Sequence, residues 1–259
     1  MINYEVAMQQ FMLFILILIR IATFFSVAAI FNTANTPARI KVGLAFFVTL
    51  IVYTLHPDMT VEYNGAIELG IIVLKEVVVG LFLGAVTSFC VQIIIYSGAI
   101  IDMDTGLSMA QNFDSTSRVQ IGIVGNIYYY CLLLLLIVTG LHRYLLEAII
   151  ETYNVIPIGQ VTFSPSIYDA VLEFMGDYFV IGFRIALPVF AVTLLLNVVL
   201  AILARIAPQM NMFVVGMQLK IFIGIFAVLF TIIMLPAVST FIEDKIHTLL
   251  AALVRGMSP

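Results

Sequence analysis

Apolar residues gather along the chain in long blocks that short polar stretches separate. Six such blocks cover about residues 6–31, 42–56, 66–101, 119–150, 178–204 and 213–241. A helix needs about 20 apolar residues to cross the hydrocarbon core of a bilayer. By that measure only the block from Val42 to Leu55 is too short for a comfortable span. The pattern predicts an all-α integral membrane protein with about six apolar helical segments.

Turn-forming residues stand between these blocks, which indicates that the segments are arranged as helical hairpins. The breaks contain Asn32–Pro37, His56–Asp58, the polar stretch 102–118, the stretch 152–166 and Pro208. The third block is too long for one span, and its uncharged part runs from Val77 to Ile101. That part holds Gly80 and Gly84, a spacing that lets two helices approach closely. The tail from Ile242 to Val254 has the period of an amphipathic helix.

Composition agrees with a membrane protein. Hydrophobic residues make up 63% of the chain and charged residues 10%, with a mean hydropathy of +1.17, whereas soluble domains carry about 25% charged residues. The 259 residues leave no stretch for a separate soluble fold, so we expect one domain over 1–259. The first ten residues include Glu5 and no Lys or Arg, which predicts a retained first helix. The net charge of −4 includes no basic tract for nucleic acid.

Charged residues also occur inside or beside the apolar blocks. An Arg or Lys at the bilayer centre costs about 2.5–3.5 kcal/mol on insertion scales. Glu68 and Lys75 are seven residues apart, as are Asp177 and Arg184, so each pair shares a helix face. Together with Arg20 they predict a buried polar stripe. Three explanations stay open: ion pairs between helices, the lining of a pathway, or side chains that snorkel to the interface.

Signatures of catalysis are absent from the sequence. It contains no His-Glu-x-x-His pattern and no phosphate-binding glycine loop, and its three histidines are isolated. Cys90 and Cys131 lie within apolar blocks and are typical of small buried hydrophobic residues. Asp102 and Asp104 are the only candidates for a membrane enzyme. We therefore predict no catalytic, cofactor-binding or metal-binding residue. The central polar break that holds both aspartates is either a re-entrant loop or an extramembrane turn.

The segment after the fifth block resembles a known motif. It reads Arg-Ile-Ala-Pro-Gln-Met-Asn-Met-Phe from Arg205 to Phe213 and continues to Lys220. This closely resembles the motif of the FliR family, the R-type subunits of the flagellar export gate, and of its counterparts in virulence type III secretion. Arg20 through Arg39 is similar to the opening hairpin of that family, and Gly106 through Asp114 is similar to its central loop.

The resemblance implies a single copy that joins P-type and Q-type subunits (FliP and FliQ) in a helical pore complex for unfolded flagellar proteins. It also implies FlhB and FlhA as partners, and the inner membrane at the flagellar basal body as the location. Residues of about 1–175 would form a P-like part and those of about 176–259 a Q-like hairpin. The central loop would contribute to a plug that closes the pore. Its residues would be Met103, Gly106, Met109, Phe113 and Asp114, with Phe113 as the apolar stopper.

Two interpretations of the motif itself stay open. It is a hairpin turn whose polar side chains cap the next helix, or it is also a contact with neighbouring subunits at the cytoplasmic mouth. The motif residues concerned are Arg205, Pro208, Gln209, Asn211, Phe213 and Lys220. The competing functions are a virulence export gate and a small-molecule transporter. Transporters usually show two related halves, and no internal repeat is visible in this sequence.

Overall fold

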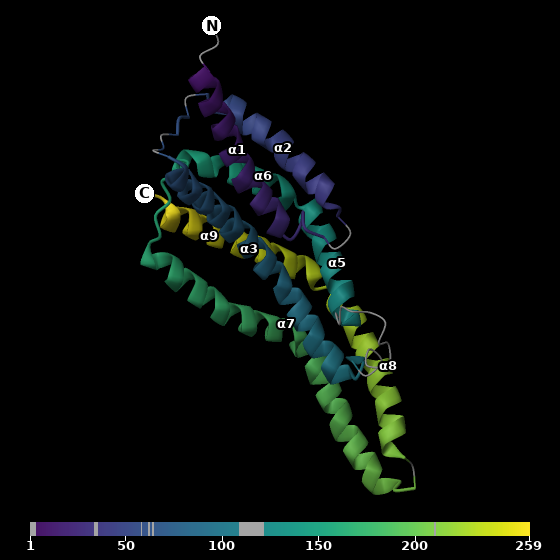
Figure 1. The fold of residues 1–259 in the computed structure, drawn as a ribbon. Coiled ribbons are helices and arrows are strands. Elements are labelled where there is room, and N and C mark those ends of the chain that lie inside the picture. The colour runs from purple at the N-terminus through teal and green to yellow at the C-terminus, as the bar shows by residue number, and fades with distance from the viewer. Residues whose placement is uncertain are drawn as a thin grey trace. The chain divides into compact units, whose positions relative to one another are not determined.

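The computed structural model describes residues 4–33, 36–57, 59–61, 63, 65–108, 122–209 and 211–259. Within them the chain forms eight helices and no strand (Figure 1). The helices are α1 (Tyr4–Val27), α2 (Ala38–Leu55), α3 (Ala66–Thr105), α5 (Ile123–Val138), α6 (Leu141–Val155), α7 (Pro165–Ile206), α8 (Met212–Ile232) and α9 (Leu235–Met257). Five of them are long and apolar enough to cross a membrane, and the bent pair α5 and α6 makes a sixth candidate. The prediction of an all-α membrane protein is confirmed.

Two of the six predicted blocks are each broken into two helices. The first break lies at Gly140, whose φ of 90° is a left-handed conformation that glycine adopts readily, and α5 and α6 bend there by 68°. The second separates α8 from α9. Pro236 has no N–H group, and in a continuous helix its ring would clash with the carbonyl of Ile232, which is the residue where α8 ends.

Other boundaries also differ from the predicted ones. The second block begins at Ala38, not Val42, so α2 has 18 residues and qualifies as a span. The charges in the third block do not interrupt its helix, because α3 runs for 40 residues up to Thr105. At 1.5 Å per residue it is about 60 Å long, twice the hydrocarbon thickness. The 42-residue α7, which contains Pro188, is of similar length.

The chain divides into two compact units, each assembled from segments far apart in the sequence. Unit one comprises Met1–Cys90, Gly140–Glu173 and Asp244–Pro259, and unit two comprises Val91–Thr139 and Phe174–Glu243. The helices α3, α7 and α9 each contribute residues to both units. The subdivision into a P-like and a Q-like part rests on the resemblance and stays a prediction.

In unit one, α1 is the central helix. Its buried face carries Leu16, Ile17, Ile21, Phe24 and Phe25, and α2 packs beside it as the second arm of a hairpin. The glycine pair of α3 lies against the same helix. A methyl group added at Gly84 would come within 2.9 Å of the Phe24 carbonyl oxygen, and one at Gly80 would overlap the side chain of Thr23. The predicted close approach through these two glycines is confirmed.

The C-terminal part of α9 also belongs to unit one. Ile246, Leu250 and Leu253 are buried along one face, as the amphipathic period predicted. Just before α7, the backbone N–H of Thr162 donates to the Met257 carbonyl at 3.2 Å, and that of Ser164 donates to the Gly256 carbonyl at 3.0 Å. These two hydrogen bonds hold the end of α9 against the connection between α6 and α7.

In unit two, the last turns of α3 contact α5, α7 and α8. Gly98 lies directly against Gly125 of α5, and Thr105 lies against Gly224 of α8. The carboxylate of Asp102 accepts hydrogen bonds from the backbone N–H groups of Val124 at 3.2 Å and Gly125 at 3.5 Å. Since these N–H groups have no partner within α5, Asp102 caps that helix from a different one.

Asp104 likewise makes a structural contact in unit two, because its carboxylate accepts a hydrogen bond from the hydroxyl of Thr193 on α7. The polar break predicted from residue 102 onward is thus helical as far as Thr105, with α3 held on both sides. Both aspartates therefore hold α3 against neighbouring helices of unit two.

Candidate functional site

Arg20 is the centre of a buried polar cluster in unit one. Its side chain is 0% exposed, as is that of Glu76 on α3. The Arg20 Nε donates to a Glu76 carboxylate oxygen at 2.5 Å, and Nη2 donates to the other at 3.1 Å. Nη1 and Nη2 both donate to the Ile156 carbonyl at 3.1 Å, and Nη1 also donates to the hydroxyl of Thr152 at 3.3 Å. All three guanidinium nitrogens therefore have acceptors.

Neighbouring groups complete this cluster. The Arg20 guanidinium lies 4.3 Å from the ring centre of Tyr153, a cation–π arrangement. Glu76 also accepts from the backbone N–H of Gly159 at 2.9 Å, and Lys75 donates to the Gly159 carbonyl at 2.9 Å. Because no donor of Arg20 is left for a ligand, the geometry favours the first explanation for this residue, an ion pair between helices.

The other members of the predicted polar stripe are less buried. In unit one, Lys75 is half-buried and Glu68 is exposed. In unit two, Asp177 is half-buried and Arg184 is exposed. Of the five residues of the predicted stripe, the chain buries only Arg20, and the role of the other four in a stripe stays a prediction. The sequence pattern missed the pairing of Arg20 with Glu76, although Glu76 is a charge within an apolar block.

The Arg205–Lys220 motif forms the turn between α7 and α8 and the start of α8. The side chain of Asn211 accepts hydrogen bonds from the backbone N–H groups of Phe213 at 3.2 Å and Val214 at 3.5 Å. The predicted cap on α8 is therefore present. Arg205, Pro208 and Gln209 are exposed, Phe213 is 71% exposed and Lys220 is half-buried. Most of the motif is thus open to a partner, and its contact role stays a prediction.

The residues predicted to form a plug fall in two groups. Met103 lies near the end of α3 with 75% of its side chain exposed, and Gly106 follows that helix with a φ of 82°. Met109, Phe113 and Asp114 lie outside the described residues.

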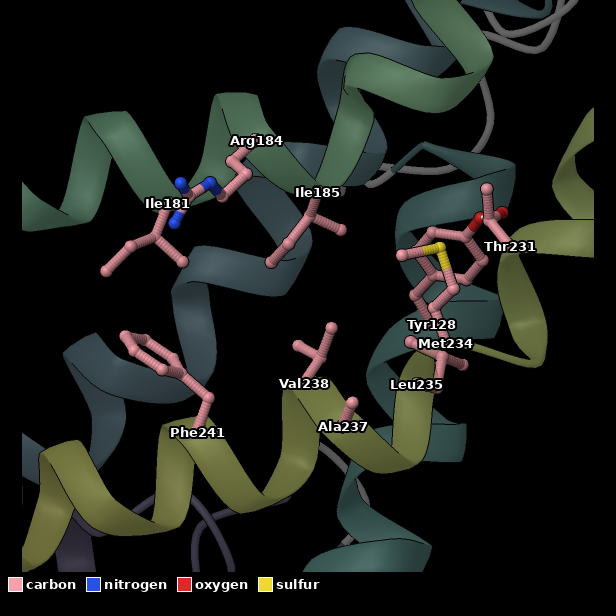
Figure 2. Close-up of a pocket in the computed structure, with 10 residues that line it drawn as sticks. All are labelled: Tyr128, Ile181, Arg184, Ile185, Thr231, Met234, Leu235, Ala237, Val238 and Phe241. Atoms are coloured by element: carbon pink, nitrogen blue, oxygen red, sulfur yellow. The ribbon is translucent and has the colours of Figure 1, made fainter.

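Unit two also contains an apolar cavity of about 200 Å³ that the sequence did not indicate (Figure 2). Its walls come from α5, α7, α8 and α9 and from the connection between α8 and α9. The hydroxyl groups of Tyr128 and Thr231 are hydrogen-bonded to each other at one end. Figure 2 shows the Arg184 guanidinium lying back along α7 beside Ile181. Among the described residues, no group of His, Cys, Asp and Glu side chains is arranged to hold a metal ion.

Comparison with known families identifies the class of protein. The family model described as "Bacterial export proteins, family 1" matches residues 11–248. The match covers most of the chain and all eight helices in whole or in part. The chain belongs to this family of bacterial export proteins.

Individual relatives carry a more specific name. The flagellar biosynthetic protein FliR of Buchnera aphidicola subsp. Schizaphis graminum is 30% identical over 208 residues, covering 80% of both chains. That of Bacillus subtilis is 30% identical over 217 residues, covering 80% of this chain and 81% of the relative. That of Escherichia coli is 28% identical over 240 residues, covering 92% and 90%. These matches support the resemblance to the FliR family that the motifs indicated.

Proposed function

We propose that this chain is the R-type structural subunit of a flagellar type III export gate. In this role it joins FliP and FliQ around the entry channel for unfolded flagellar proteins, in the inner membrane at the basal body, with FlhB and FlhA as further partners. The observation that carries the proposal is the family match over residues 11–248, together with relatives named FliR that align over 80% or more of this chain. The subunit acts by its shape and surface and performs no catalysis.

The surface of the α7–α8 hairpin supports an assembly role. Several large apolar side chains on these helices are more than half exposed, and they are Leu195, Val198, Ile202, Ile206, Phe213, Phe222, Phe226 and Phe230. An exposed apolar surface of this extent must face lipid or other protein. Cations at the motif add a polar component that lipid chains do not satisfy. We infer that neighbouring gate subunits cover the turn of this hairpin.

Co-purification tests this assembly role. The tagged chain is expressed with FliP and FliQ, and the recovery of both is compared between Arg205→Ala and Arg39→Ala. Both arginines are exposed, but only Arg205 belongs to the motif. We expect Arg205→Ala to lower recovery severalfold and Arg39→Ala to leave it unchanged. Equal recovery of FliP and FliQ with the two variants would contradict the proposal that the motif contacts neighbouring subunits. A chain that purifies alone as a substrate-binding homo-oligomer would instead indicate a small-molecule transporter.

The plug proposal has a separate test. Phe113→Ala is expected to make membranes leak ions or to disturb gating while assembly with FliP and FliQ survives, because a ring of apolar side chains excludes water and ions from a narrow pore. Leu134→Ala serves as a control on an exposed apolar residue of α5. Ion-tight membranes and normal export in the Phe113 variant would contradict the assignment of Phe113 as the stopper.

A further inference from the structure

Arg184 is a cation in an apolar part of α7. It stands one turn before Pro188, between Phe183 and Ile185. Within the described residues its side chain makes no hydrogen bond or ion pair, in contrast to Arg20 in unit one. An arginine in a membrane-spanning segment is costly unless an anion or water accompanies it. An anion from outside the described residues would compensate this charge.

Two apolar recesses of unit two meet at this residue. The first is the cavity of about 200 Å³ in Figure 2, where the Arg184 guanidinium lies beside Ile181 of α7. The second is a shallow, open groove between α3 and α7. Arg184 shares the lining of this second recess with Tyr96, Phe179, Val180, Phe183 and Leu187. Among the described residues no Asp or Glu lines either recess, and Arg184 is the only charged side chain in the lining of both.

We propose that Arg184 binds the phosphate of an anionic phospholipid whose two acyl chains occupy the two recesses. The guanidinium fork matches a phosphate in two parallel hydrogen bonds, and this match adds geometric specificity to the charge. Apolar cavities of roughly 150 Å³ already take up a hydrocarbon the size of benzene. Both recesses thus have room for a segment of acyl chain, and each lies next to the cation.

The size of the first recess argues against a partner helix as its occupant. An α-helix with its side chains is about 10–12 Å across, and a cavity of about 200 Å³ cannot admit one. The polar groups at its far end are already engaged, because Tyr128 and Thr231 bond to each other. What remains for an occupant is an apolar surface with one cation beside it. This lipid site does not depend on the proposed export role.

Lipid binding to the full-length, delipidated chain tests the proposal. Native mass spectrometry measures the affinity for phosphatidylglycerol and for phosphatidylcholine with identical acyl chains. Arg184→Gln removes the charge, Arg184→Lys retains it, and Arg205→Gln removes an exposed cation from the same helix as a matched control. Ala237→Phe fills the first recess without touching the cation, because Ala237 is a small residue of its lining.

The wild-type chain and Arg205→Gln should prefer phosphatidylglycerol by about tenfold, because the choline cation of phosphatidylcholine already compensates its phosphate and weakens the charge-assisted contact with Arg184. Arg184→Gln should reduce the preference to about twofold, and Arg184→Lys should restore part of it. Ala237→Phe should weaken the binding of both lipids.

The proposal is overturned if the wild type shows no preference for phosphatidylglycerol, if both Gln variants lose that preference equally, or if Ala237→Phe binds both lipids like the wild type. Loss of the lipid on assembly with FliP and FliQ would assign the surface to a partner subunit and also overturn it. If Arg184→Gln does not fold, Arg184→Lys and Ala237→Phe decide the outcome.

Discussion

The substitution Glu76→Gln removes the charge that compensates Arg20 and keeps nearly the same side-chain shape. Both side chains are 0% exposed and meet through two hydrogen bonds of 2.5 and 3.1 Å. Removing one partner of a buried ion pair typically costs 3–5 kcal/mol, because the other charge stays buried without compensation. Arg20 keeps its carbonyl acceptor at Ile156, so we expect the lower end, about 3 kcal/mol.

A loss of this size is measurable as a shift of the thermal midpoint. For a chain of this length 1 kcal/mol corresponds to a shift of about 2–4 °C, so the expected decrease is on the order of 10 °C. The chain has no tryptophan whose fluorescence could follow unfolding, so a thiol-reactive dye serves as the probe. Cys90 is 0% exposed in unit one, and in a Cys131→Ala background the dye reports when unit one opens.

Two further variants separate the buried pair from a general effect of charge. Glu68→Gln removes an exposed carboxylate from the same helix and should leave the midpoint nearly unchanged, because surface pairs contribute little. In Arg20→Met/Glu76→Met neither charge of the pair is left buried, so the double variant should lose less stability than the sum of the two single changes to Met. A Glu76→Gln shift no larger than that of Glu68→Gln, or strict additivity in the double variant, would refute the reasoning.

Three more outcomes follow from the structure. Gly80→Leu should lower the thermal midpoint by several degrees in the dye assay, because even a methyl group overlaps α1 there. Gly43→Ala in α2 has open space and should not lower the midpoint, because alanine favours a helix over glycine. Asp102→Ala should destabilise unit two by about 1–2 kcal/mol through loss of the cap on α5, with Asp102→Asn losing less, as measured by protection of the α5 amides in hydrogen exchange. Asn211→Ala should speed exchange at the first amides of α8 only, by an amount that corresponds to about 1 kcal/mol; unchanged exchange would contradict its role as cap.

Much of the fold could be predicted because its signals are local. Apolar block length predicted the membrane helices, and the turn before α8 was correctly placed by Pro208 and Asn211. The errors were local too. Pro236 ends a helix that the apolar pattern alone would continue, and the left-handed Gly140 bends another. Apolar composition predicts that a segment is buried in lipid or protein, but it does not by itself predict where a helix ends or bends.

The candidate sites could be predicted only as a set of unusual residues. The sequence marked Arg20 and Arg184 in the same way, as cations in apolar helices. In the structure the first has a full set of acceptors in unit one, while the second has none among the described residues of unit two. The difference arises because α3 approaches α1 closely at Gly80 and Gly84 and so brings Glu76 to Arg20.

The sequence by itself determined the helical class, the membrane character and the family, since these depend on composition, block length and a contiguous motif. The tertiary structure alone decided which buried polar groups meet. Glu76 is 56 residues from Arg20 in the sequence, and Val124, the first residue whose amide Asp102 caps, is 22 residues after Asp102. Helical periodicity places a side chain on a face, but the packing of one helix against another selects its partner. At Arg184 the described residues supply no partner, and a charge lies beside apolar recesses.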